Sequence, residues 1–192
     1  MGNGVKIALG ILAVIAIIVV GIGGWAVGQY NKAIALDEQV KAQWAQVDNQ
    51  LKRRYDLIPN LVETVKGYAA HEKQLFENIA EARTKYFQAK DPGQQIQASN
   101  QLEGMLSRLL VLRETYPQLK ANESFLKLQD SLEGTENRIA VERKRYNEVA
   151  QTLNTYRRTV TGSIIASIAG VQQAAYYEIP AAEKEAPKVK FN

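Results

Sequence analysis

The stretch that decides the fold is residues 125–156, FLKLQDSLEGTENRIAVERKRYNEVAQTLNTY. Apolar or seam positions recur along it in alternating steps of three and four, which keeps one face of an α-helix turned to a neighbour. These positions are Phe125, Leu128, Leu132, Thr135, Ile139, Glu142, Tyr146, Val149, Leu153 and Tyr156. The pattern predicts one long helix with left-handed coiled-coil packing. At Gly134 we expect a close helix contact or a small bend.

A second helical stripe runs through residues 40–79, with apolar positions again three or four residues apart except for a gap across Glu72. It passes through Pro59 without losing phase, although proline removes a backbone donor and disfavours helical geometry at the preceding residue. Two interpretations remain open at this point. The helix kinks at Pro59, or the chain turns there.

Turn residues mark the ends of the remaining helices. The sequence Asp91-Pro92-Gly93 predicts a stop, so the preceding helix should end near Lys90. The next helical run ends near Pro117, and Asn122 can cap the long final helix. No stretch alternates in the manner of a β-strand. We predict an all-α fold, in which an N-terminal transmembrane helix precedes an antiparallel up-and-down bundle of four helices with coiled-coil-like packing.

The N-terminal segment is apolar enough to cross a bilayer. Residues 7–27 consist almost wholly of aliphatic residues, glycine and alanine, and this length spans the roughly 30 Å hydrocarbon core as a helix. Trp25 and Tyr30 then lie where aromatic rings favour the headgroup layer. A cleavable signal peptide is the alternative, but its apolar region usually runs only about 7–15 residues. Few lysines flank the segment to set its orientation in the membrane, and their distribution weakly favours a bundle on the cytoplasmic side.

The C-terminal part contains an uncharged stretch, residues 159–177, in which Ile164, Ile165 and Ile168 share a helical face. Its serine, threonine and glutamine residues make it too polar to span a membrane, so it packs on the bundle, a membrane surface or a partner. We therefore predict four parts: an anchor over 1–30, a bundle over 31–158, this segment over 159–178 and a flexible tail over 179–192.

Composition argues against most catalytic chemistry. The 192 residues include no cysteine and a single histidine, His71, so zinc ribbons, iron–sulfur clusters and cysteine nucleophiles are excluded by counting. No phosphate-binding glycine loop lies outside the apolar segment. We expect no catalytic residue, no cofactor and no metal. Basic triplets are spread around their helices among acidic residues, so we expect no nucleic-acid partner either.

The most polar cluster lies on the second stripe and comprises Arg53, Arg54, Asp56, Asn60 and Glu63. Most of these side chains can be explained as surface pairs one helical turn apart, which contribute only tenths of a kcal/mol. The functional alternative is that Arg53 or Arg54 reaches into a carboxylate network that docks another protein, since guanidinium groups bind carboxylates in a planar, bidentate manner.

Two long segments carry a family resemblance. The run QLKRRYDLIPNLVETVKGY, residues 50–68, resembles the signature of the LemA family of bacterial membrane-anchored proteins. Residues 119–122, LKAN, and residues 132–140, LEGTENRIA, are similar to a second family segment, and residues 185–191, EAPKVKF, resemble the family's ending. One departure is visible, because Thr159-Val160 and Gly170-Val171 stand where family members commonly carry Phe-Pro and Gly-Phe.

The resemblance implies a helical bundle on one anchor, and a family often found near membrane metalloproteases and envelope-stress functions. With the residue patterns, it predicts a non-enzymatic scaffold in the bacterial inner membrane that self-assembles or docks an envelope partner. The alternatives are a lipid-surface binding module and an accessory factor of a membrane metalloprotease. The interaction candidates are Arg53, Arg54, Asp56, Asn60, Glu63, Ile164, Ile165 and Ile168.

Overall fold

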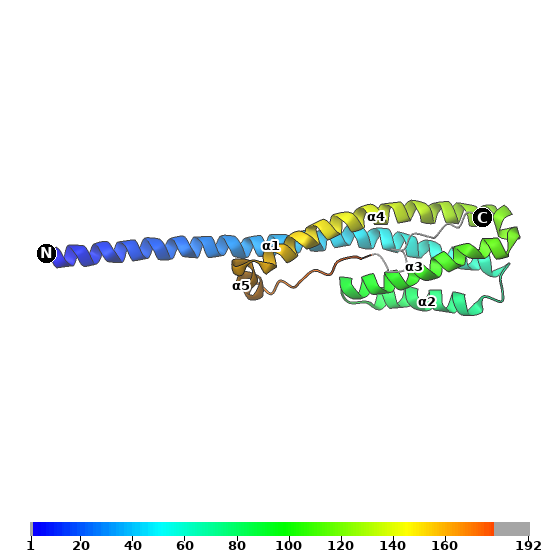
Figure 1. Ribbon diagram of the computed structural model, residues 1–192, viewed down its shortest axis with the longest axis horizontal. Helices are drawn as coiled ribbons and strands as arrows, with labels where there is room; N and C mark the ends of the chain where they lie inside the picture. The colour runs from blue at the N-terminus through cyan, green and yellow to red at the C-terminus, as the bar shows by residue number, and fades with distance from the viewer. Residues whose placement is uncertain (1, 179–192) are drawn as a thin grey trace, which may run out of the picture. The chain divides into compact units, whose positions relative to one another are not determined.

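A computed structural model describes residues 2–178 and shows only helices and connecting segments among them (Figure 1). The chain runs through α1 (Asn3–Lys66), α2 (Lys73–Gln88), α3 (Pro92–Thr115), a 3₁₀ helix η1 (Pro117–Ala121), α4 (Glu123–Arg158) and α5 (Val160–Ile168). The prediction of an all-α fold with a long apolar N-terminal helix and a bundle is confirmed. The tail over 179–192 lies outside the described residues.

Helix α1 continues through Pro59. Proline has no backbone N–H, so the carbonyl of Tyr55, four residues earlier, loses its partner within the helix. The Arg83 side chain on α2 replaces it, donating from Nε to the Tyr55 carbonyl at 3.2 Å. The same guanidinium lies 5.0 Å from the centroid of the Phe87 ring. A side chain from the adjacent helix therefore satisfies the carbonyl that Pro59 orphans, and the chain does not turn at this position.

The expected single stripe over residues 40–79 is wrong in one respect, because the chain breaks between α1 and α2 at residues 67–72. Ala69 still donates to the carbonyl of Val65 at 2.9 Å, and Glu72 then donates to Ala69 at 3.0 Å in a tight turn. Tyr68, which the stripe places in the core, is exposed. Helix α2 ends at Gln88, two residues before the expected Lys90.

The cap at Asn122 forms as expected, and Asp91, which was expected only as a turn residue, caps α3. Asp91 accepts a hydrogen bond from the backbone N–H of Gln94 at 2.9 Å, and Pro92 occupies the first helical position of α3. Asn122 accepts from the N–H of Phe125 at 2.9 Å at the start of α4. Gly134 makes no close helix contact, because a Cβ atom there would meet nothing within 4 Å.

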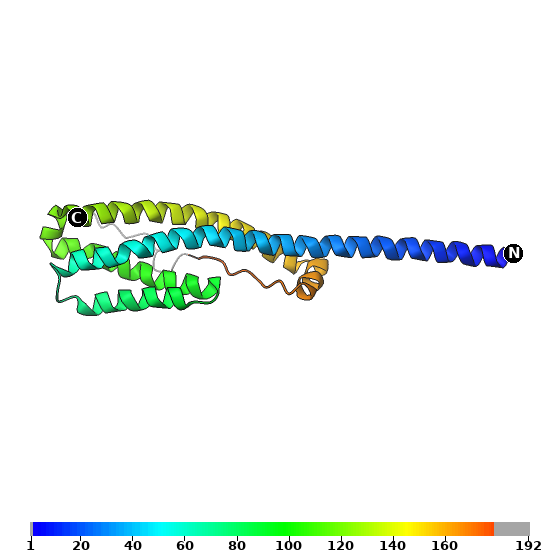
Figure 2. The same ribbon diagram turned by 180° about the vertical axis from the view of Figure 1, so that it is seen from behind.

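The chain divides into two compact units. Unit 2 comprises Ala42–Glu148 and the chain from Ala175, of which residues 175–178 are described. Its helices lie side by side (Figures 1 and 2), and α2 and α3 pack along their lengths. Its largest fully buried side chains include Tyr55, Ile58, Leu61, Tyr86, Leu109, Phe125, Ile139 and Tyr146. These residues come from all four helices, as expected of a bundle core.

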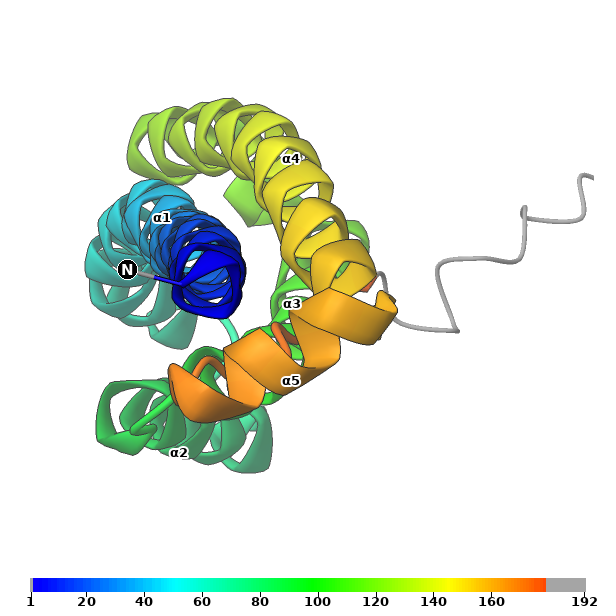
Figure 3. The same cartoon turned by 90° about the vertical axis from the view of Figure 1, so that its left-hand side faces the viewer.

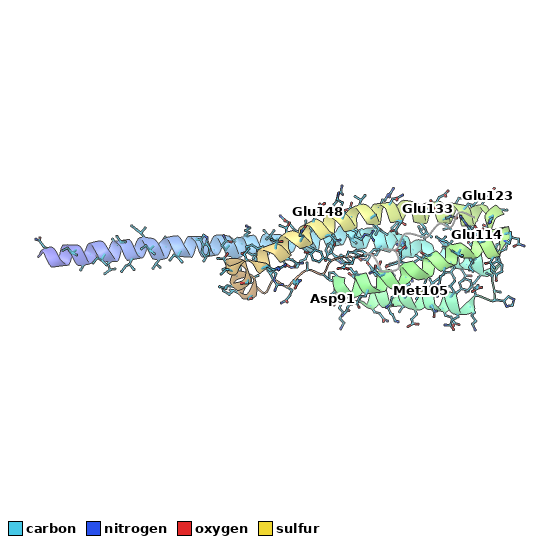
Figure 4. All side chains as sticks on the ribbon, in the orientation of Figure 1. Asp91, Met105, Glu114, Glu123, Glu133 and Glu148 are labelled. Atoms are coloured by element: carbon cyan, nitrogen blue, oxygen red, sulfur yellow. The ribbon has the colours of Figure 1, made fainter. Side chains whose placement is uncertain are left out.

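Unit 1 comprises Met1–Lys41 and Val149–Ala174. None of the described side chains of residues 7–27 is buried, and Figure 4 shows them projecting outwards around the helix. Beyond this apolar stretch, the Tyr156 hydroxyl on α4 donates to the Gln29 carbonyl at 3.0 Å, and Ala33 is fully buried. Helix α5 begins directly after α4 and lies crosswise to α1 (Figures 1 and 3).

Candidate docking surface

A groove of unit 2 lies between α1 and α2. It has a volume of about 450 Å³, and Ile58, Pro59 and Val62 contribute from α1 while Phe76 and Ile79 contribute from α2. Charged side chains of both signs also line it: Glu63, Lys66, Lys73, Glu77 and Arg83. An apolar floor with a mixed charged rim suits a protein segment that carries an apolar side chain and flanking charges. We call this feature the α1–α2 groove.

Four of the five polar candidates on α1 form an exposed row. Arg53, Asp56, Asn60 and Glu63 are all exposed, and their spacing of three, four and three residues keeps them on one side of the helix. Glu63 also lines the α1–α2 groove and accepts a hydrogen bond from Lys66 at 2.9 Å. The exposed row therefore leads directly into the groove. Whether it binds a partner stays a prediction.

The fifth candidate, Arg54, lies inside the bundle. Its side chain is 6% exposed, and Nη1 lies 2.7 Å from a carboxylate oxygen of Glu103 on α3 and 2.7 Å from one of Glu136 on α4. Burial alone would lower the pKa of Arg54, but the hydrogen bond and charges of the two carboxylates outweigh it and raise the pKa. Arg54 thus reaches two carboxylates, and both belong to the same chain.

This arginine joins the two segments that carry the family resemblance. Arg54 belongs to residues 50–68, whereas Glu136 belongs to residues 132–140. A hollow of about 120 Å³ beside the ion pair is lined by Arg54, Glu103, Glu133 and Glu136 together with leucines of α3 and α4. Glu133 projects from α4 in Figure 4. The two sequence segments are therefore linked by a partly buried ion pair.

The apolar candidates on α5 are placed differently. Ile164 and Ile168 are exposed, Ile165 is half-buried, and the buried positions of this helix are Gly162 and Ala166. A Cβ atom on Gly162 would lie 2.0 Å from the carbonyl oxygen of Tyr156, so only glycine allows this close approach. On the expected apolar face of α5, Ile164 and Ile168 therefore remain exposed, and only Ile165 is partly covered.

The chain after α5 is held by asparagine side chains, a feature that the sequence analysis missed. In unit 1, Asn154 donates to the Ala174 carbonyl at 2.9 Å and accepts from the Ala174 N–H at 3.0 Å. In unit 2, Asn147 binds the backbone of Tyr177 in the same two-way manner, at 3.0 and 2.8 Å. The available signal was two asparagines seven residues apart beside the apolar face of one helix. We call residues 169–178 the strap.

Within unit 2, three further hydrogen bonds hold the strap. The Tyr177 hydroxyl shares a hydrogen bond of 2.7 Å with Ser99 of α3, the Asn100 amide donates to the Glu178 carbonyl at 3.3 Å, and the Tyr146 hydroxyl donates to the Ala175 carbonyl at 2.8 Å. Burial raises the pKa of Tyr146 to about 12 and also raises the pKa of Tyr177. Both phenols therefore remain protonated at neutral pH. These contacts fix the strap to α3 and α4.

Two more buried tyrosines join α1 to α2. The rings of Tyr55 and Tyr86 meet edge to face with centroids 4.3 Å apart, and the Tyr86 hydroxyl donates to Asp48. Burial raises the pKa of both phenols, and for Tyr86 the hydrogen bond to Asp48 adds to the effect. Asp48 also pairs with Lys52 at 2.6 Å. The Tyr86 hydroxyl and Asp48 thus have structural roles at this interface, whereas the buried Tyr55 hydroxyl has no hydrogen-bond partner within the described chain.

No group of three or more potential metal-ligating side chains comes together within residues 2–178. One helix, residues 7–66, is long and apolar enough to cross a membrane by length and composition. These results leave the groove, the exposed row and α5 as the surfaces with features suited to binding.

The profile of the LemA family matches residues 43–191, which is most of the chain. The chain belongs to the LemA family. Two magnetosome proteins are also similar: MamQ 2 of Paramagnetospirillum magneticum is 26% identical over 93% of the chain and 74% of its own length. MamQ of Magnetospirillum gryphiswaldense is 24% identical over 95% and 76%. Protein LemA of Metamycoplasma hominis is 21% identical over 82% and 73%.

The LemA family match contains both halves of the Arg54 ion pair, the α1–α2 groove and the strap. The apolar stretch of α1 precedes the matched region, although the similar MamQ proteins align with nearly the whole chain. The family prediction from the two sequence segments is therefore confirmed, and the comparisons support a membrane-associated helical protein.

Proposed function

We propose that this LemA-family protein is a non-enzymatic, membrane-tethered scaffold that docks a protein partner in the bacterial cell envelope. The observation that carries the proposal is the continuity of α1. Its apolar residues 7–27, which are long enough to span a bilayer, and its core-forming residues such as Leu51 and Leu61 belong to one uninterrupted helix. A bundle joined to its anchor without a loop is suited to presenting a binding surface at the membrane.

The docking surface in this proposal is the α1–α2 groove with the exposed row beside it. Its rim pairs acidic Glu63 and Glu77 with basic Lys66, Lys73 and Arg83, so a partner segment of mixed charge can be complementary to it. A membrane metalloprotease, which the family resemblance suggests, is one candidate partner. A second copy of this chain is the other.

The test is gentle extraction of the full-length protein from bacterial membranes, followed by measurement of its mass under native conditions. We expect a defined complex heavier than the 21.4 kDa monomer. Ala80→Trp places a large ring in the α1–α2 groove from an exposed position and should dissolve this complex. Ala45→Trp, at an exposed alanine of α1 that does not line the groove, is the matched control.

The outcomes separate the parts of this proposal. A monomer in the wild type would contradict the scaffold function. A complex that survives Ala80→Trp as well as Ala45→Trp would remove the groove from the proposal. The proposed cytoplasmic location of the bundle is tested separately. A cysteine is introduced at exposed Val111, and its reaction with a membrane-impermeant reagent is measured in intact cells. Labelling from outside would reverse the proposed orientation.

A further inference from the structure

Helix α5 exposes its large aliphatic residues and buries its small ones, which is the reverse of an ordinary surface helix. Val160, Ile164 and Ile168 follow each other at four-residue intervals and are 82%, 59% and 70% exposed. The face turned inward carries Gly162 and Ala166 instead. A surface helix normally buries its large aliphatic side chains, since each contributes about 1.5–3 kcal/mol when removed from water. The exposed face of α5 therefore suits an apolar environment outside the chain.

Contacts within unit 1 place this helix beside the end of the apolar stretch of α1. Tyr156, four residues before α5, bonds the carbonyl of Gln29, and Lys32 lies 5.4 Å from the centroid of the Tyr156 ring. Gln29 follows the apolar residues 7–27 by two positions. Trp25 and Tyr30, both exposed on α1, flank the same level. Amphipathic rings favour the membrane–water interface, so α5 lies where α1 leaves the hydrocarbon core.

The direction of α5 fits the same location. It lies crosswise to α1 (Figures 1 and 3), so an upright α1 holds α5 parallel to the membrane plane. Thr159 fixes this turn by accepting a hydrogen bond from the Gly162 N–H at 3.0 Å and donating to the Tyr156 carbonyl at 2.8 Å. Helices that lie in the interface insert their apolar face about 5–10 Å into the headgroup–acyl boundary.

Basic side chains precede α5 where lipid phosphates would lie. Arg158 is exposed, and Arg157 is half-exposed with a buried Nε that has no hydrogen-bond partner within the described chain. Together with Lys32, these residues place three positive charges at the level of Gln29. Basic residues at the membrane surface are attracted to anionic lipids by about 1 kcal/mol each.

We propose that α5 is an interfacial helix that inserts Val160, Ile164 and Ile168 into the bilayer that α1 crosses, with Arg157 and Arg158 bound to lipid phosphate groups. This proposal rests on the membrane tether of the proposed function. It deepens that function by giving the scaffold a second attachment to the membrane. Two attachments, one across the bilayer and one along its surface, restrain the tilt of unit 1.

The test uses the absence of cysteine, because each introduced cysteine carries a unique label. We would prepare full-length Ile164→Cys, Ile15→Cys and Val111→Cys variants, attach an environment-sensitive fluorophore and reconstitute them in vesicles of phosphatidylcholine and phosphatidylglycerol. Val111 is 62% exposed and Ile164 is 59% exposed, so these two positions are matched. Lipids with a nitroxide near the headgroup or near the chain end then report depth. Helical circular dichroism checks that each variant is folded.

We expect the label at Ile164 to shift to shorter wavelength and to be quenched most by the headgroup nitroxide. The label at Ile15 should be quenched most by the chain-end nitroxide, and the label at Val111 by neither. A label at Ile164 that behaves like that at Val111, with Ile15 deep, would overturn the proposal and leave the tether intact. A blue shift at Ile164 without lipid quenching would also overturn it, since a protein would then cover α5. Loss of quenching at Ile15 would instead contradict the tether.

Replacing both arginines tests the headgroup contact. Arg157→Gln with Arg158→Gln should reduce the quenching at Ile164 in the anionic vesicles, and high salt should have the same effect in the unmodified chain. Arg108→Gln with Arg138→Gln, at two exposed positions of unit 2, removes the same charge and should leave the quenching unchanged. Equal effects of the two pairs would overturn the proposed lipid contact.

Discussion

Helices α1 and α5 both carry large aliphatic side chains along one face, and they use that face in opposite ways. In α1, Leu51, Ile58 and Leu61 are fully buried against the other helices of unit 2. In α5, Ile164 and Ile168 are exposed while Gly162 and Ala166 face inward. Helical periodicity therefore identifies an apolar face, but the neighbour of that face is decided elsewhere. Small residues on the opposite face indicate that a helix can bury that face and leave its large aliphatic side chains exposed.

The largest expected difference is between a leucine of α1 and an isoleucine of α5. Leu61→Ala should lower the free energy of unfolding by about 2–5 kcal/mol, because it leaves a cavity in the core. Ile164→Ala should change it by no more than about 0.5 kcal/mol, because the side chain has few partners. Urea unfolding of the detergent-solubilised protein, followed by helical circular dichroism, measures both. Equal losses would show that Ile164 packs within the chain.

A second comparison concerns neighbouring arginines on α1. Arg54→Ala should cost about 3 kcal/mol of unfolding free energy, because Glu103 and Glu136 then lose their partly buried counter-ion. Arg53→Ala, at an exposed position, should cost no more than about 0.5 kcal/mol. The same unfolding experiment reads both values. Replacement of Arg54 by Met with both glutamates changed to Gln should recover most of the loss, and a failure to recover would contradict the charge explanation.

Two glycines sharpen the view of which helix faces are crowded. Gly162→Ala should destabilise unit 1 by about 1–3 kcal/mol, because its Cβ would meet the Tyr156 carbonyl and the turn must shift. Gly134→Ala should stabilise the protein by about 0.5–1 kcal/mol, because its Cβ meets open space in the middle of α4. Thermal unfolding would compare them, and a change of the same sign in both would be inconsistent with the structure.

The smallest effect is the coupling between Pro59 and Arg83. Arg83→Leu should cost about 1 kcal/mol or slightly more, because the Tyr55 carbonyl loses its donor. In a Pro59→Ala background, the alanine N–H can bond that carbonyl, so the same replacement should cost distinctly less. A double-mutant cycle of unfolding free energies gives the difference. No coupling between the two positions would contradict the role assigned to Arg83.

Local chemistry made most of the fold predictable. Asp91-Pro92-Gly93 marked the stop between two helices, and Asn122 marked a helix start through its side-chain acceptor. The period of α4 identified most of its buried positions. The passage through Pro59 could not be predicted, because the rescuing side chain comes from another helix. The position of Arg54 could have been found: it lies three residues after Leu51 and four before Ile58, on the apolar stripe itself.

The site was less predictable because it depends on pairs that are distant in the sequence. The apolar stripe places Arg54 inside the bundle, but the carboxylates that it binds come from α3 and α4, which are distant in the sequence. The groove lies between α1 and α2, and no local sequence pattern records it. For α5, composition showed an apolar face but gave no sign that glycine and alanine would take the inner side.

The asparagine contacts to the strap have a consequence for how this part of the chain can change. Asn154 binds only the main-chain atoms of Ala174, and Asn147 only those of Tyr177. Every residue except proline presents the same N–H and C=O groups. These contacts therefore depend on the number of residues in the segment and not on which residues they are. Side chains at the exposed positions of the strap are thus free to vary, whereas those of Val171 and Tyr177 are buried. An inserted or deleted residue, in contrast, would put the wrong peptide unit opposite each asparagine.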